Sequence, residues 1–172
     1  MADGQPSMTI FPNDIWQQCE QKYLCDPQAY IALQDNYQVN VNLLLLAQQL
    51  DQQSYPLGIN DWQQLSRLIE PWEAGVLKPY RQLRRLAKAH LTTDEYQKML
   101  QVELMLEHKS QKMLLQRINL IHADSIASNK TGKDAQINST INTTINGTLI
   151  SANQNSYHYL SLFGLTLSHL PS

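Results

Sequence analysis

The chain has 172 residues, a formal net charge of −2, 42% hydrophobic residues and 16% charged residues. This length corresponds to about one domain, and the apolar content is sufficient for a core, which excludes a chain disordered throughout. The near-neutral charge argues against a surface built wholly for nucleic acid, although it is compatible with a local basic face.

Residues 1–12 are expected to form a flexible N-terminus. The first 16 residues contain no Lys or Arg and no long apolar run, so a secretory signal is not expected. Cys19 and Cys25 are the only cysteines, and their spacing fits neither CxxC nor a disulfide framework, which predicts reduced thiols. The longest apolar run, Leu43 to Ala47, is far shorter than the roughly 20 residues that span a bilayer. We therefore expect a cytoplasmic protein without a transmembrane segment.

Helix-start signals recur along the chain, because a side-chain oxygen there can accept an unpaired backbone N–H of the first turn. They predict five helices, near 13–24, 27–36, 40–53, 60–89 and 93–122. The predicted caps are Asn13, Asp26 before Pro27, Asn40, Asn60 with Gln63, and Thr92 with Glu95. The last two pairs have the spacing of a capping box.

The third helix contains the run NVNLLLLAQQL, residues 40–50. At about 100° per residue its apolar side chains cover most of the helix circumference, and only Asn42 and Gln49 form a polar strip. A helix that is apolar on most sides is buried on most sides. This segment is therefore predicted to be the central helix of an all-α bundle, with an exposed partner groove as the alternative.

The fourth helix contains Pro71 and Pro79, which predict breaks or kinks because proline removes a backbone donor. Residues 75–90, GVLKPYRQLRRLAKAH, hold five positive charges and no carboxylate. The apolar side is formed by Val76, Tyr80, Leu83 and Ala87, and the basic side by Lys78, Arg81, Arg84, Arg85 and Lys88. The basic side is either a solvated face or an anion-facing surface for an acidic protein, RNA or anionic lipid.

The fifth helix is amphipathic. Its apolar arc consists of Met99, Val102, Leu106, Met113 and Leu120, and its solvent side of Lys98, Gln101, His108, Lys109 and Lys112. Two carboxylate pairs share a helix face, Glu70 with Glu73 and Glu103 with Glu107. Such pairs can serve acid–base chemistry, but solvated helix carboxylates are the commoner interpretation.

Residues 125–156 are rich in Asn, Ser and Thr and include the repeat INST INTT INGT. Poor helix formers and too few repeats for a solenoid predict a disordered low-complexity insert. Residues 157–172 are apolar again and are expected to pack back as a short helix. The predicted organisation is thus a single bundle of five to six helices over residues 13–124, completed by this C-terminal segment.

No catalytic signature is present. The chain contains no GxSxG or GxGxxG, and TGKD at 131–134 lacks both the first glycine and the Ser or Thr of a phosphate-binding loop. The five histidines have no HxxxH spacing, and neither Glu103 nor Glu107 is followed by a histidine three residues later. We therefore predict no catalytic residue, no metal site and no cofactor.

Three stretches together carry a resemblance: VNVNLLLLAQQL, IEPWEAGVLKPYRQLRRLAK, and YQKMLQVELMLEHKSQ with a terminal YLSLFGL. They resemble an uncharacterised family of small proteobacterial helical proteins, a domain of unknown function. Its pattern is an Asp-Val-Asn-Leu-Leu-Leu block, a Pro-Trp block leading to Pro-Leu-Arg-x-Leu-Arg, and a Glu-rich helix. The resemblance spans residues 14–122 and 156–165; Asn40 replaces Asp and Tyr80 replaces Leu.

The resemblance implies a helical fold and a bacterial cytoplasm but no activity. By motif it points to Asn42, Trp72, Pro79, Arg81 and Arg84. The leading hypothesis is a binding or adaptor protein that uses the basic helix face. Enzymatic activity is the less favoured interpretation. The first alternative is an enzyme or small-ligand protein whose pocket joins Asn42, Trp72 and Glu73; the second is a weak RNA-binding protein.

Overall fold

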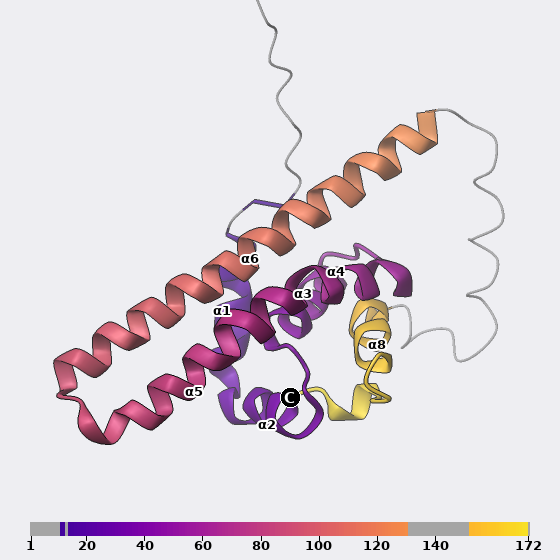
Figure 1. Cartoon of the computed structure of the whole chain (residues 1–172). Helices are drawn as coiled ribbons and strands as arrows, with labels where there is room; N and C mark the ends of the chain where they lie inside the picture. Colours follow the sequence, from indigo (N-terminus) through magenta and orange to yellow (C-terminus); the bar gives the residue numbers. More distant parts are fainter. Residues whose placement is uncertain (1–10, 13, 131–151, 172) are drawn as a thin grey trace, which may run out of the picture. The chain divides into compact units, whose positions relative to one another are not determined.

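The computed structural model describes residues 11–12, 14–130 and 152–171, with the side chains of 128–130 left aside (Figure 1). Across these ranges the regular structure is helical and no strand occurs, which confirms the all-α prediction. The chain divides into two compact units. The first comprises the described residues up to Gln63 and from Ile118 onward, and the second comprises Gln64–Arg117.

The first unit contains three consecutive helices, α1 (Ile15–Cys25), α2 (Pro27–Tyr37) and α3 (Val41–Gln52). The caps predicted for the second and third are confirmed. Asp26 accepts a hydrogen bond from the Ala29 N–H at 3.2 Å, and Asn40 accepts one from the Leu43 N–H at 3.1 Å. The predicted cap Asn13 lies outside the described residues.

Helix α3 is the centre of the first unit, as its sequence predicts. Every residue from Leu43 to Leu50 is buried. Gln49, predicted to belong to a polar strip, is also buried and donates a hydrogen bond to Gln18 of α1. Gln48 accepts a 2.8 Å hydrogen bond from the Tyr30 hydroxyl. Neighbouring side chains thus satisfy the polar groups of a helix that is enclosed on all sides.

Helix α8 (Gln154–Ser161) packs against α3 and is fixed by Asp51 near the end of α3. The Asp51 carboxylate accepts the Asn155 N–H at 2.8 Å, the Ser156 N–H at 3.0 Å and the Ser156 hydroxyl at 2.6 Å. A carboxylate at a helix N-terminus accepts its unpaired N–H groups and complements its dipole. Asn155 and Ser156 are buried, so these two residues of the predicted insert belong to the folded unit.

Asn155 holds the loop between α3 and α4 (Ile59–Trp72) against α8. Its Oδ1 accepts hydrogen bonds from the Leu57 N–H at 2.8 Å and the Trp62 indole N–H at 3.3 Å, and its Nδ2 donates to the Tyr55 carbonyl at 2.8 Å. One amide side chain therefore satisfies three buried or half-buried groups from three residues.

Asn155→Ala is expected to lower the free energy of unfolding by about 2 to 4 kcal/mol, because it leaves these groups unpaired. Urea denaturation followed by circular dichroism measures the change. Asn153→Ala is the matched control, since Asn153 precedes the same helix without a side-chain capping bond. Equal stability of the two variants would show that the Asn155 bonds do not hold the unit together.

Two findings extend the first unit beyond the predicted boundaries. Phe11, predicted to lie in a flexible N-terminus, is buried, and its N–H donates to the Asn119 side chain at 3.2 Å. Helix α6 (Thr93–Lys130) continues eight residues past the predicted end at 122. The repeat INST INTT INGT lies outside the described residues.

The second unit is a helical hairpin, called here the hairpin (residues 64–117). Its first arm consists of the end of α4, the π-helix η1 (Glu73–Leu77), α5 (Lys78–Ala87) and the 3₁₀ turn η2 (Lys88–His90); its second arm is α6 up to Arg117. The predicted irregularity is confirmed, because a π-helix directly follows the segment that contains Pro71. Pro79 is tolerated in the first turn of α5.

The predicted cap at Asn60 is wrong, because α4 already begins at Ile59. Asp61 instead accepts a hydrogen bond from the Gly58 N–H at 3.0 Å. The capping box of α6 is confirmed. Glu95 accepts the Thr92 N–H at 2.8 Å, the Glu95 N–H donates to the Thr92 hydroxyl at 3.3 Å, and these bonds lower the pKa of Glu95.

Both cysteines are free thiols. Burial raises the pKa of Cys19 to about 12, so this thiol is a poor nucleophile at neutral pH. Over the part of the chain that the structure describes, no helix combines the length and apolar character needed to cross a membrane, and this includes the 38-residue α6.

Candidate functional site

The two arms of the hairpin run side by side in opposite directions (Figure 1). Two aromatic side chains of the first arm donate hydrogen bonds to backbone carbonyls of α6: the Trp72 indole to Leu106 at 3.1 Å and the Tyr80 hydroxyl to Met99 at 3.0 Å. A carbonyl inside a helix already accepts one bond and has a lone pair for a second. These contacts fix the two arms in register.

Arg81 lies in the seam between the arms and faces three carboxylates. Its guanidinium is 2.8 Å from Glu107, 3.6 Å from Glu103 and 3.7 Å from Glu73. The Arg81 side chain is only 17% exposed, and Glu73 only 3%. The pairing with Glu107 is a hydrogen bond, whereas Nη1, which faces Glu73, makes none.

Arg84, one turn further along α5, closes the other end of this seam. Its guanidinium makes two hydrogen bonds to Glu103 and one of 2.6 Å to the Tyr96 hydroxyl. The hydrogen bond to Glu103 raises the pKa of Arg84 further above its already high value. We call Glu73, Arg81, Arg84, Glu103 and Glu107 the seam cluster.

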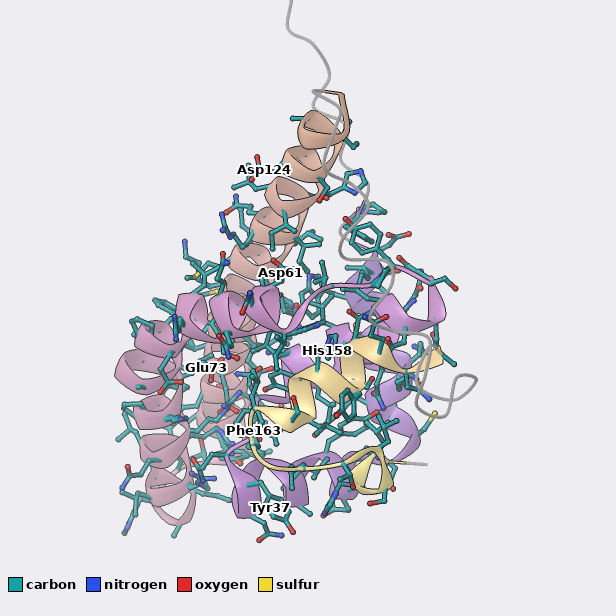
Figure 2. The ribbon with its side chains drawn as sticks, turned by 90° about the vertical axis from the view of Figure 1, so that its right-hand side faces the viewer. Tyr37, Asp61, Glu73, Asp124, His158 and Phe163 are labelled. Carbon is teal, nitrogen blue, oxygen red and sulfur yellow. The ribbon has the colours of Figure 1, made fainter. Side chains whose placement is uncertain are left out.

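Glu73 enters the seam cluster from the π-helix η1. It lies on the side of this segment that faces α6 (Figure 2), where it accepts a 3.2 Å hydrogen bond from the buried Ser110 hydroxyl. A π turn contains more residues than an α turn, so it changes which side chains face the neighbouring helix. The interpretation of Glu73 and Glu103 as solvated carboxylates is therefore wrong.

The sequence places Arg81 on a basic side opposite Leu83, whereas the structure turns Arg81 and Arg84 inward and leaves Leu83 exposed. A helical wheel separates polar from apolar sides but does not say which side faces a partner helix. The signal that the helical wheel misses is the charge complementarity between the arginines of α5 and the glutamates of α6. Arg81 and Arg84 are three residues apart and Glu103 and Glu107 four apart, a spacing that matches across an antiparallel pair.

The other predicted binding residues face outward. Lys78 is half-exposed and lies 3.9 Å from Glu70, a weak surface pair. Arg85 is exposed. Lys88 is exposed with its ammonium group 5.5 Å from the centre of the Tyr96 ring, a cation–π distance.

The predicted pocket residues are distributed over both units. Asn42 is half-buried in the first turn of α3, in the first unit, whereas Trp72 and Glu73 belong to the hairpin. Trp72 is half-buried and bonded to Leu106, and Glu73 is engaged by Ser110 and Arg81. The described residues contain no group of three or more side chains arranged to hold a metal ion.

Charge is divided unequally along the chain. Residues 64–117 contain 10 Lys and Arg against 6 Asp and Glu, a net charge of +4, so the rest of the chain carries −6. Each hairpin carboxylate has a partner inside the hairpin. Three belong to the seam cluster, Glu70 pairs with Lys78, Asp94 with Lys98, and Glu95 caps α6. The outward cations thus dominate the field of the hairpin.

No curated protein and no solved structure matches the chain. A family model does match it over residues 14–114, which include α1 to α5 and the hairpin part of α6 nearly to its end. The match confirms the resemblance to a domain of unknown function noted from the leucine, Pro-Trp and arginine blocks. The chain belongs to the family described as Protein of unknown function (DUF2390).

Proposed function

We propose that this protein is a binding or adaptor protein whose basic hairpin contacts an acidic protein. The single observation that supports this most strongly is the charge division, +4 on the hairpin against −6 on the rest of the chain. Such a division attracts an acidic partner to one part of the molecule and speeds its encounter.

The contact surface consists of the outward cations of α5, namely Lys78, Arg85 and Lys88. The sequence predicts Arg81 and Arg84 on the same surface, but they do not contact the partner directly. They neutralise the carboxylates of α6 and so reduce the negative charge near the contact surface. Arg85 pairs with no carboxylate in the described part of the chain. It is therefore available to one from a partner.

An acidic protein fits these observations better than RNA or anionic lipid. The hairpin exposes cations interspersed with large apolar side chains, an arrangement suited to a protein surface. RNA binding commonly adds exposed aromatic side chains for base stacking, yet Trp72 and Tyr80 are half-buried and bonded to α6. The proposal places the protein in the cytoplasm, with which two free thiols agree.

Arg85→Glu with Lys88→Glu is expected to abolish capture of acidic proteins from a native extract while changing the free energy of unfolding by no more than about 1 kcal/mol. Captured proteins are identified by mass spectrometry at two salt concentrations, because a charge-driven contact weakens with salt. A matched control introduces the same charge change of −4 in the first unit at four exposed positions: Gln17→Glu, Gln21→Glu, Ala32→Glu and Asn36→Glu.

The control variant is expected to retain the partners of the wild-type protein. If the Arg85 and Lys88 variant keeps every partner, the cations are merely solvated and the proposal fails. Single-stranded RNA and phosphatidylserine vesicles are tested in parallel. Binding to either one in place of acidic proteins would replace the proposed partner class.

A further inference from the structure

The chain itself carries two parts of opposite charge. The hairpin has a net charge of +4 and the rest of the chain −6, so the hairpin of one copy attracts the remaining part of another copy. The whole chain has a net charge of only −2, which leaves little general repulsion between copies. A second copy of the chain therefore meets the description of an acidic partner for the hairpin.

Two carboxylates of the first unit are available to a cation from outside. Glu20 on α1 and Asp35 on α2 are exposed, and neither makes an ion pair or a side-chain hydrogen bond in the described part of the chain. Four other carboxylates of this unit have roles within it: Asp14 lies at the positive N-terminal end of α1, and Asp26, Asp51 and Asp61 accept backbone N–H groups.

Each of the two available carboxylates has an exposed apolar side chain one helical turn away. Leu24 follows Glu20 by four residues and is 59% exposed, and Ile31 precedes Asp35 by four residues and is 36% exposed. Residues four apart lie on the same side of a helix. Protein contacts commonly combine apolar side chains with charged groups at their edge, so α1 and α2 each offer both kinds of group.

We propose that the acidic partner of the hairpin is a second copy of this chain, whose Glu20 and Asp35, called here the acidic pair, meet Arg85 and Lys88, called the basic pair. The inference rests on the proposed function and names its partner. The contact joins two different surfaces, so it is heterologous, and repeated contacts close into a ring or continue as an open chain of copies.

Sedimentation velocity of the full chain at several concentrations measures the association. The wild-type chain is expected to form species larger than a monomer at an ionic strength of about 0.05 M and to dissociate at about 0.5 M, because salt screens attraction between exposed charges. Arg85→Gln with Lys88→Gln should weaken self-association by at least about tenfold, and Glu20→Gln with Asp35→Asn should do the same. Circular dichroism verifies that all variants fold.

Mixing the two neutralised variants tests whether the acidic pair of one copy meets the basic pair of another. One variant keeps only the acidic pair and the other keeps only the basic pair, so a mixture can form a single contact for each pair of chains. The mixture is expected to give a one-to-one dimer and no larger species, whereas each variant alone stays monomeric.

A matched control separates this contact from an effect of total charge. Gln52→Lys with Gln53→Lys raises the net charge by the same amount as neutralising the acidic pair, at two exposed positions outside α1 and α2. Because both pairs remain intact, this control is expected to self-associate like the wild type.

Four results would overturn the inference. These are a wild-type chain that stays monomeric at low salt, self-association that neither neutralised variant weakens, a mixture that forms no dimer, and a control that dissociates as fully as the acidic-pair variant. If the wild type stays monomeric while Arg85→Glu with Lys88→Glu still abolishes capture of other acidic proteins, the second-copy inference fails and the proposed function stands. If that capture is also unchanged, both fail.

Discussion

Leu46→Asn is expected to lower the free energy of unfolding by about 3 to 6 kcal/mol, the largest effect of any single change considered for the first unit. Leu46 is fully buried on α3, and its neighbours from Leu43 to Leu50 are buried as well. The change removes apolar contacts and places an amide at a position with no access to solvent. Since total stability is typically about 5 to 15 kcal/mol, a large part of the population would unfold.

The measurement is urea denaturation monitored by circular dichroism at 222 nm. Leu24→Asn is the matched control, because Leu24 lies on the neighbouring helix α1 and is exposed. It is expected to change the free energy by about 0.5 kcal/mol or less. Similar denaturation curves for the Leu46 variant and the wild type would refute the assignment of α3 as the central helix.

Arg81→Met is expected to lower the free energy of unfolding by about 3 to 5 kcal/mol, because it leaves the buried Glu73 carboxylate without its cation. Glu73 would keep the Ser110 hydroxyl, and Glu103 would keep Arg84. The methionine replaces most of the side-chain volume, so the lost charge rather than a cavity dominates the effect. Thermal and urea unfolding both measure it.

Two further variants separate charge from packing. Arg85→Met, on the exposed side of the same helix, should change stability by no more than about 0.5 kcal/mol. Adding Glu73→Gln to Arg81→Met should restore part of the loss, because a neutral amide is less costly to bury than an unpaired carboxylate. An Arg81 variant as stable as the Arg85 variant would place Arg81 in solvent and remove the seam cluster.

The predictions confirmed from sequence rest on local chemistry. The caps Asp26, Asn40 and Thr92 depend on side chains within three residues of the bonds they make, and the buried α3 follows from its apolar circumference. The irregularity predicted from Pro71 is the π-helix η1, which begins two residues after it. In each case the cause lies within one helical turn of the effect.

What could not be predicted depends on contacts between distant segments. The buried Glu73 carboxylate is paired with Arg81 and with the Ser110 hydroxyl, which is 37 positions away in the sequence. The buried Asn155 side chain accepts a hydrogen bond from the Leu57 N–H, which is 98 positions away. The orientation of α5 follows from which of its sides meets α6. The residues next to Glu73 and Asn155 in the sequence do not indicate that either side chain is buried, so the sequence predicts that both are exposed to solvent.

The hairpin arginines Arg81 and Arg84 lie in the seam, whereas Arg67 and Arg85 face solvent. Nitrogen-15 NMR of the arginine Nε–Hε groups tests this division most directly. Slow hydrogen exchange is expected for Arg81 and Arg84, which lie against Glu103, and fast exchange for the exposed Arg67 and Arg85. Fast exchange for all four, or protection of Arg85 with exposed Arg81, would contradict it.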